Sequence, residues 1–150
     1  MPRAPLLLDA SVWFAAAHSP TGGSALVVEI CQGVRYRAVV SQLLLFETLH
    51  NLRRKSTADA VARFYTLLAK TSPEMLDPPT ASELEAIGMV TAPKDRYVLA
   101  LARRLPVHAA ITLDRRHLLT PEARSAVAPI LLLTPAEFLE ELRRSPLVSG

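Results

Sequence analysis

Four of the 14 acidic residues in this 150-residue chain lie in apolar surroundings or at the start of an apolar segment. Asp9 directly follows three leucines, and Asp114 closes the apolar segment AAITLD. Glu47 follows four apolar residues, and Asp95 begins the segment DRYVLALARRL. A carboxylate among apolar side chains is costly unless hydrogen-bond donors or a cation satisfy it. These four residues are therefore the first candidates for chemistry.

Each of these carboxylates also has a purely structural interpretation. Asp95 could be the N-cap of the helix that it begins, and Asp9 and Asp114 could each cap the helix or turn that follows. Glu47 could lie on the exposed edge of its helix. For any one residue taken alone, the sequence leaves both interpretations open.

Apolar segments alternate with helical patterns along the chain. Strands are predicted where apolar or β-branched residues run together, at 5–9, 36–41, 74–76, 109–114 and 129–133. Helices are predicted between and after them, at 11–19, 24–32, 42–55, 57–71, 81–90, 95–105 and 134–144. Ser41 is the expected N-cap of the third helix, and Thr134 with Glu137 forms an expected capping box. The pattern predicts an α/β fold, a three-layer sandwich with a central, mostly parallel sheet.

The predicted sheet brings the four carboxylates toward one edge. The carboxyl ends of parallel strands share a rim, and ligands of open α/β sheets bind there. Asp9, Asp114 and the helix starts that carry Glu47 and Asp95 all belong to this rim. Four carboxylates in one crevice repel each other unless a cation holds them. Oxygen ligands suit Mg²⁺ or Mn²⁺, and the sequence has neither a zinc-spaced His/Cys cluster nor a glycine-rich phosphate loop.

The composition is that of a folded protein, with 50% hydrophobic and 21% charged residues. We expect one domain over residues 1–150. No apolar run approaches the roughly 18 residues of a membrane span, and Asp9 interrupts the first leucine run too early for a secretion signal. The single cysteine, Cys31, excludes an internal disulfide. We therefore expect a cytoplasmic protein, whose net charge of +3 permits a polyanionic partner.

Five segments in order resemble one known family. They are LLLDASVWFAA, VVSQLLLFETLHNL, PKDRYVLALARRL, AAITLDRRHL and PILLLTPAEFLEEL. Together they resemble the PIN-domain nucleases, most of all the small VapC-like toxins of toxin–antitoxin modules. Two features depart from the family pattern: DAS stands where a threonine often follows the first aspartate, and the proline-rich stretch from about 74 to 94 does not align.

The resemblance assigns roles residue by residue. It implies that Asp9, Glu47, Asp95 and Asp114 are the catalytic, metal-binding carboxylates. It also implies that Ser11 and Thr112 line the site and orient carboxylates or water.

The implied function is a divalent-metal-dependent endoribonuclease. Mg²⁺ or Mn²⁺ would activate water against an RNA phosphodiester, leaving a 5′-phosphate, and the partners would be RNA, a cognate antitoxin and a second copy of the chain in a homodimer. Among the basic residues, Arg115 and Arg116 are the best candidates for RNA contacts because they follow Asp114 directly. His117 could contact a phosphate or donate a hydrogen bond near the site.

Two other functions are compatible with an α/β fold. One is a non-catalytic RNA-binding or regulatory module, for which intact carboxylates would be unnecessary. The other is a phosphatase-like or receiver-like domain, which needs a further acidic motif after a nucleophilic aspartate. Asp9 is followed by ASVW, without such an acid.

Overall fold

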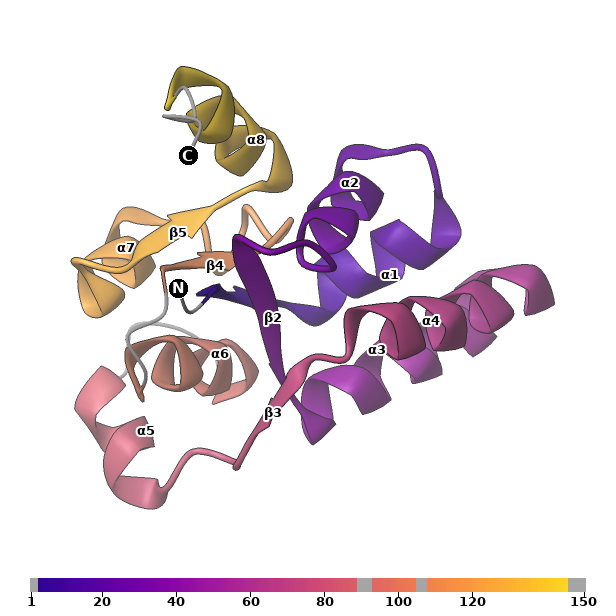
Figure 1. Ribbon diagram of the computed structural model, residues 1–150. Coiled ribbons are helices and arrows are strands. Elements are labelled where there is room, and N and C mark those ends of the chain that lie inside the picture. The colour runs from indigo at the N-terminus through magenta and orange to yellow at the C-terminus, as the bar shows by residue number, and fades with distance from the viewer. Residues whose placement is uncertain (1–2, 89–92, 105–107, 146–150) are drawn as a thin grey trace.

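The computed structural model describes residues 3–88, 93–104 and 108–145 (Figure 1). Within these residues, five strands form one sheet of order β3-β2-β1-β4-β5. They are β1 (Ala4–Leu8), β2 (Tyr36–Ser41), β3 (Glu74–Leu76), β4 (Ala109–Ile111) and β5 (Leu131–Leu133). Every neighbouring pair is parallel. The predicted α/β fold with a central parallel sheet is confirmed.

The central strand explains the opening run of leucines. β1 lies between β2 and β4, with Leu7 opposite Val39 on one side and Ala110 on the other. Leu6, Leu7 and Leu8 have no exposed surface. A parallel strand covered by helices on both faces is buried on both faces, so its side chains do not alternate between apolar and polar.

Helices cover both faces of the sheet (Figure 1). One group, whose members contact each other, consists of α1 (Ala10–His18), α2 (Gly23–Ile30), α3 (Gln42–Lys55), α4 (Ala58–Thr71) and α8 (Pro135–Arg144). The other consists of α5 (Ala81–Ile87), α6 (Pro93–Arg104) and α7 (Pro121–Val127).

Helix starts follow the capping chemistry of the sequence. The hydroxyl of Ser41 accepts a hydrogen bond from the backbone N–H of Leu44, and Thr134 with Glu137 forms a complete capping box. Both were predicted. Helix α7 was not predicted, although Thr120 caps it and Pro121 occupies its first turn. These two residues are the usual signal for a helix start, but the helix that follows has only seven residues.

Two predicted boundaries near the carboxylates are wrong. Strand β4 ends at Ile111, so Asp114 lies three residues beyond the strand rather than at its end. The hydroxyl of Thr112 accepts the backbone N–H of Asp114, and this local hydrogen bond competes with extension of the strand. Helix α6 begins at Pro93, so Asp95 lies inside the first turn and is not the N-cap. The ends of the helices predicted at 81–90 and 95–105 lie outside the described residues.

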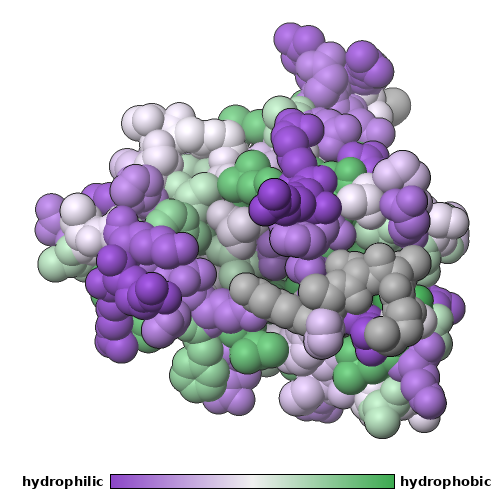
Figure 2. Space-filling model, turned by 180° about the vertical axis from the view of Figure 1, so that it is seen from behind, coloured by the Kyte–Doolittle hydropathy of each residue, from purple (hydrophilic) through white to green (hydrophobic). Residues whose placement is uncertain are grey.

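The face opposite to the one in Figure 1 is mainly hydrophilic, with smaller apolar areas between the polar ones (Figure 2). Phe46 and Leu43, on α3, are among the exposed large apolar side chains, with Phe46 60% exposed. Within the described ranges, no helix has the length and apolar character that crossing a bilayer requires.

A two-point ion pair joins α5 to α6. Arg104 donates from Nη2 to one carboxylate oxygen of Glu83 at 2.7 Å and from Nε to the other at 2.9 Å. Arg104 also donates to the backbone carbonyls of Asp77 and Pro78. The hydrogen bonds from Arg104, followed by the backbone N–H of Thr80, lower the pKa of Glu83 from 4.5 to about 2. The guanidinium therefore connects the loop after β3, α5 and α6.

This pKa shift predicts an acid-dependent stability contribution. Because the pKa of Glu83 is lower in the folded protein, the contribution is complete above pH 4.5 and disappears as the pH falls toward 2. Glu83→Gln retains the capping-box geometry but removes the charge. We expect Glu83→Gln to lower the thermal unfolding midpoint at pH 7, with the difference from wild type shrinking below pH 4.5. Glu85→Gln, on the same helix, is the control, and a difference that stays constant from pH 7 to pH 3 would contradict the assignment.

Candidate functional site

Asp9 lies at the junction of β1 and α1, where its backbone N–H donates to the carbonyl of Ile111 at 3.0 Å. The residue is buried, with 8% of its surface exposed. Asp9 occupies the N-cap position of α1, but its side chain makes no capping hydrogen bond. Instead, Oδ2 accepts hydrogen bonds from the hydroxyls of Ser11 and Thr112, both at 2.8 Å. The carboxylate is therefore turned toward these two hydroxyls, and the capping interpretation of Asp9 is wrong.

The second carboxylate oxygen of Asp9 is chemically available. Within residues 3–88, 93–104 and 108–145, no hydrogen bond reaches Oδ1 and no ion pair reaches this carboxylate. A buried carboxylate favours a positive partner, because burial removes the water that would otherwise solvate its charge. Asp9 thus offers a fixed oxygen without a protein cation beside it.

The two hydroxyls that hold Asp9 also hold the loop after β4. Thr112 is fully buried, and its hydroxyl accepts the backbone N–H of Asp114 at 3.0 Å. The hydroxyl of Ser11 accepts the backbone N–H of Leu113 at 3.0 Å. Each hydroxyl therefore donates to Asp9 and accepts from the loop, which fixes the position of Asp114 relative to Asp9.

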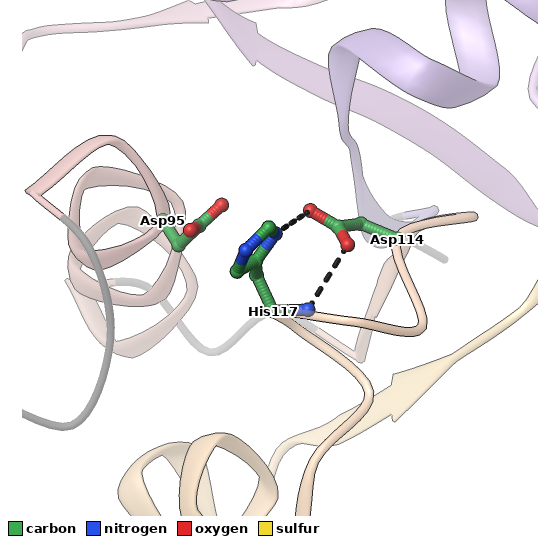
Figure 3. A group of neighbouring side chains, drawn as sticks. All are labelled: Asp95, Asp114 and His117. Carbon is green, nitrogen blue, oxygen red and sulfur yellow. Dashed lines mark hydrogen bonds and ion pairs between the residues drawn. The ribbon is translucent and has the colours of Figure 1, made fainter.

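Asp95, Asp114 and His117 form a second group on the same rim. One possible ligand atom from each lies within 4.8 Å of the others. Asp95 comes from α6 and is 8% exposed. Figure 3 shows the His117 ring between the carboxylates of Asp95 and Asp114. The backbone N–H of His117 donates to Oδ1 of Asp114 at 3.0 Å, and its Nδ1 lies 3.4 Å from Oδ2 (Figure 3).

Glu47 reaches the rim from α3. It lines a pocket of about 350 Å³ together with Asp9 and Ser11. The neighbouring Thr48 is fully buried, and its hydroxyl donates to the carbonyl of Leu44 at 2.8 Å and lies 3.4 Å from that of Ala10. Thr48 thus holds α3 against the start of α1, which places Glu47 beside Asp9.

A hydrogen bond from Tyr97 positions α6. The hydroxyl of Tyr97 donates to the Ser41 hydroxyl at 3.0 Å, at the carboxyl end of β2. Tyr97 is two residues from Asp95, so this bond sets the first turn of α6 against the rim. The structure therefore places all four predicted carboxylates at the carboxyl ends of the parallel strands, Asp9 with Glu47 and Asp95 with Asp114.

The donors on this rim fit a hard divalent cation. They are carboxylate oxygens held by hydroxyls and backbone groups, with one imidazole beside them. Mg²⁺ prefers such oxygen ligands, and Mn²⁺ also accepts an imidazole nitrogen. The residues present are therefore compatible with the ion that the sequence predicts.

His117 was not among the predicted ligands, although it lies close to two of them. The signal was its position three residues after Asp114 in a turn, where a side chain returns toward the first residue. Arg115 and Arg116 are both exposed. The charge of Arg115 also contributes, after the backbone N–H of Thr134 and the charge of Arg124, to lowering the pKa of Glu137. Arg115 therefore lies near the start of α8.

Comparison with known proteins supports this architecture. A sequence profile for the PIN domain matches residues 6–123. No functionally curated protein matches the sequence significantly.

Solved structures share the fold. The protein PAE2754 from Pyrobaculum aerophilum superimposes with a TM-score of 0.63 at 17% identity, over 94% of this chain and 90% of the other. VapBC2 from Rickettsia felis, solved with a DNA fragment from its promoter, superimposes with a TM-score of 0.59 at 12% identity, over 87% of this chain and 98% of the other.

VapC20 from Mycobacterium tuberculosis, described as a toxin that cleaves the sarcin-ricin loop, gives a TM-score of 0.50 at 18% identity, over 70% of this chain and 86% of the other. At these identities the likeness concerns the fold. Because the PIN domain match covers most of the 150 residues, the chain belongs to the PIN domain family.

Proposed function

We propose that this protein is a divalent-metal-dependent endoribonuclease. The observation that carries the proposal is the buried carboxylate of Asp9, which is oriented by two hydroxyls and has no cation among the described residues. Asp114, Asp95 and Glu47 lie on the same rim. A site that gathers carboxylates in this way favours a bound cation over any neutral ligand.

Each residue has a role in the proposed site. Asp9 and Asp114 are the central ligands of Mg²⁺ or Mn²⁺, because both are fixed by hydrogen bonds to the ends of strands. Asp95 and Glu47 complete the set of ligands from α6 and α3. Ser11 and Thr112 orient Asp9, and His117 holds the carboxylate of Asp114.

The proposed reaction is hydrolysis of an RNA phosphodiester bond by water. When bound, the cation lowers the pKa of a water molecule and offsets the charge of the phosphate. The protein positions the carboxylates before the substrate arrives, so the site needs little rearrangement. Arg115 and Arg116 are exposed beside Asp114 and are the proposed contacts to RNA phosphates.

The proposed biological role is that of a toxin in a toxin–antitoxin pair, acting in the cytoplasm. Similarity to VapBC2 and VapC20 supports this proposal. The proposed partners are a cognate antitoxin and a second copy of this chain. Exposed apolar side chains such as Phe46 on α3 and Leu26 on α2 are suitable for protein contacts.

The proposed function predicts metal-dependent cleavage. Purified protein should cut labelled RNA when Mg²⁺ or Mn²⁺ is present, and cleavage should stop when EDTA removes the metal. Loss of a residue that supports a metal ligand typically lowers metal affinity or activity about 10–100-fold. Asp9→Asn removes the charge of a ligand itself, so it should slow cleavage at least about 100-fold. Asp59→Asn, on the exposed first turn of α4, is the matched control.

Cleavage that persists in EDTA would contradict this mechanism. Cleavage by Asp9→Asn at the wild-type rate would also contradict it. RNA binding by the wild-type protein without cleavage in either metal would favour the non-catalytic RNA-binding module instead.

A further prediction concerns the Thr112 hydroxyl, which orients Asp9. Thr112→Val retains the shape of the side chain but removes the hydrogen bonds to Asp9 and to the Asp114 N–H. We expect Mn²⁺ affinity, measured by calorimetry, to fall about 10–100-fold, and the free energy of unfolding to fall by about 1–3 kcal/mol.

Thr112→Ser retains the hydroxyl and should recover most of the metal affinity. Thr66→Val removes a threonine hydroxyl on the exposed face of α4 and should leave metal binding unchanged. If Thr112→Val is folded and binds Mn²⁺ as tightly as wild type, Thr112 does not position the metal ligand.

A further inference from the structure

A groove lies between α1 and α3 and extends from Asp9 and Glu47 at the acidic rim to Phe14 on α1 and Lys55 on α3. The two helices pack together, and the pocket of about 350 Å³ lies between them. Its volume is within the range of small-ligand sites. The pocket is lined by Asp9, Ala10, Ser11, Phe14, Ala15, Glu47, Asn51, Lys55 and Leu113.

The helices run in the same direction and in register. The Thr48 hydroxyl lies 3.4 Å from the carbonyl of Ala10, and at the other end the Ser56 hydroxyl lies 2.6 Å from Nδ1 of His18. Both contacts join residues 38 positions apart. This constant offset places Phe14 of α1 level with Leu52 of α3, the residue after Asn51, and Phe14 and Asn51 both line the pocket.

The groove is therefore chemically ordered from end to end. Glu47, Asn51 and Lys55 follow each other at intervals of four residues and form one stripe on α3. From Glu47 to Lys55 the stripe spans about 12 Å, at 1.5 Å per residue. It begins at the carboxylates, continues past an amide and ends at an exposed lysine.

Phe14 forms the aromatic wall of the groove. Its ring stacks on His18 with centroids 5.6 Å apart and planes inclined by 17°, and the contact with Ser56 fixes the His18 ring. Phe14 is half-buried and lines the pocket. Trp13, by contrast, is fully buried and packs edge-on against Phe64, so it is part of the core.

An amide, an aromatic ring and a cation lie along the groove, and they match two parts of a nucleotide: the ring and the amide match its base, and the cation matches its phosphate. Unpaired bases stack on aromatic side chains, and amides bond the edges of bases. Lysine neutralises phosphate. We propose that the groove holds one unpaired nucleotide of an RNA substrate beside the bond that is cut, with its base at Phe14 and Asn51 and the next phosphate at Lys55. This assignment rests on the proposed ribonuclease function.

The test of the base contact measures RNA binding in EDTA, which separates it from cleavage. A labelled single-stranded RNA is compared with variants in which each base in turn is removed. In the wild-type protein, loss of one base should weaken binding about 5- to 150-fold, which corresponds to one stacked base. Phe14→Leu should bind the intact RNA more weakly and lose its sensitivity to that position.

Two control variants separate stacking from folding. Phe14→Tyr retains the ring and should retain the sensitivity to the missing base. Tyr65→Leu, at a half-exposed position on α4, should behave as wild type. If Phe14→Leu is folded and responds to every missing base as wild type does, the groove holds no base. If Phe14→Leu weakens only the binding of a protein partner, the groove is a protein-docking surface and the proposal is wrong.

The lysine contact has an independent readout in salt dependence. For single-stranded nucleic acid, each neutralised phosphate contributes about 0.7 to the slope of log affinity against log salt. Lys55→Gln should reduce this slope by about 0.7. Lys70→Gln, at the corresponding end of α4, should leave the slope unchanged. If the slope is unchanged in Lys55→Gln, Lys55 does not contact a phosphate of the bound RNA.

Cleavage is scored separately, so the two proposals can fail separately. The protein could show the predicted base and salt dependence in EDTA and yet never cut RNA with Mg²⁺ or Mn²⁺. This result would refute the nuclease proposal but would still support nucleotide binding in the groove. Protein that cuts RNA while Phe14→Leu keeps full sensitivity to every base would refute the groove alone.

Discussion

The site depends on one constraint, namely that a buried strand ends in a carboxylate. β1 is the central strand of a parallel sheet, and three of its leucines have no exposed surface. The charge of Asp9 can emerge only where the strand leaves the core. There the hydroxyls of Ser11 and Thr112 donate hydrogen bonds to Asp9 and accept hydrogen bonds from backbone N–H groups of the loop after β4. The carboxylate is thereby stabilised without a protein cation.

The helices that surround Asp9 are fixed by a few buried polar contacts. Thr48 joins α3 to the start of α1, and Tyr97 joins α6 to the cap of α3. Hydrogen bonds have directional geometry, so these contacts set positions that apolar packing alone would leave less specific. The same contacts place Glu47 beside Asp9 and align α1 with α3. The acidic rim and the groove beside it thus share one framework.

The sequence by itself determined most of the fold. Apolar strands alternating with capped helices indicated a parallel sheet, and β2, Ser41 and the capping box at Thr134 occur as predicted. The signals for these features are local, because periodicity and capping act within a few residues. Prediction was weaker at Asp114 and Asp95, where a side-chain hydrogen bond ends the strand early and a proline starts the helix early. The seven-residue helix α7 was missed.

The sequence also identified the four carboxylates, since charges next to apolar runs stand out and the order of motifs resembled a family. Only the tertiary structure decided how they are arranged. It turned Asp9 away from the helix cap and toward Thr112, more than 100 residues later in the chain. It brought His117 between Asp95 and Asp114 (Figure 3) and brought Phe14 of α1 and Asn51 of α3 into the lining of one pocket. These relations depend on contacts between distant segments, and no local pattern in the sequence specifies them.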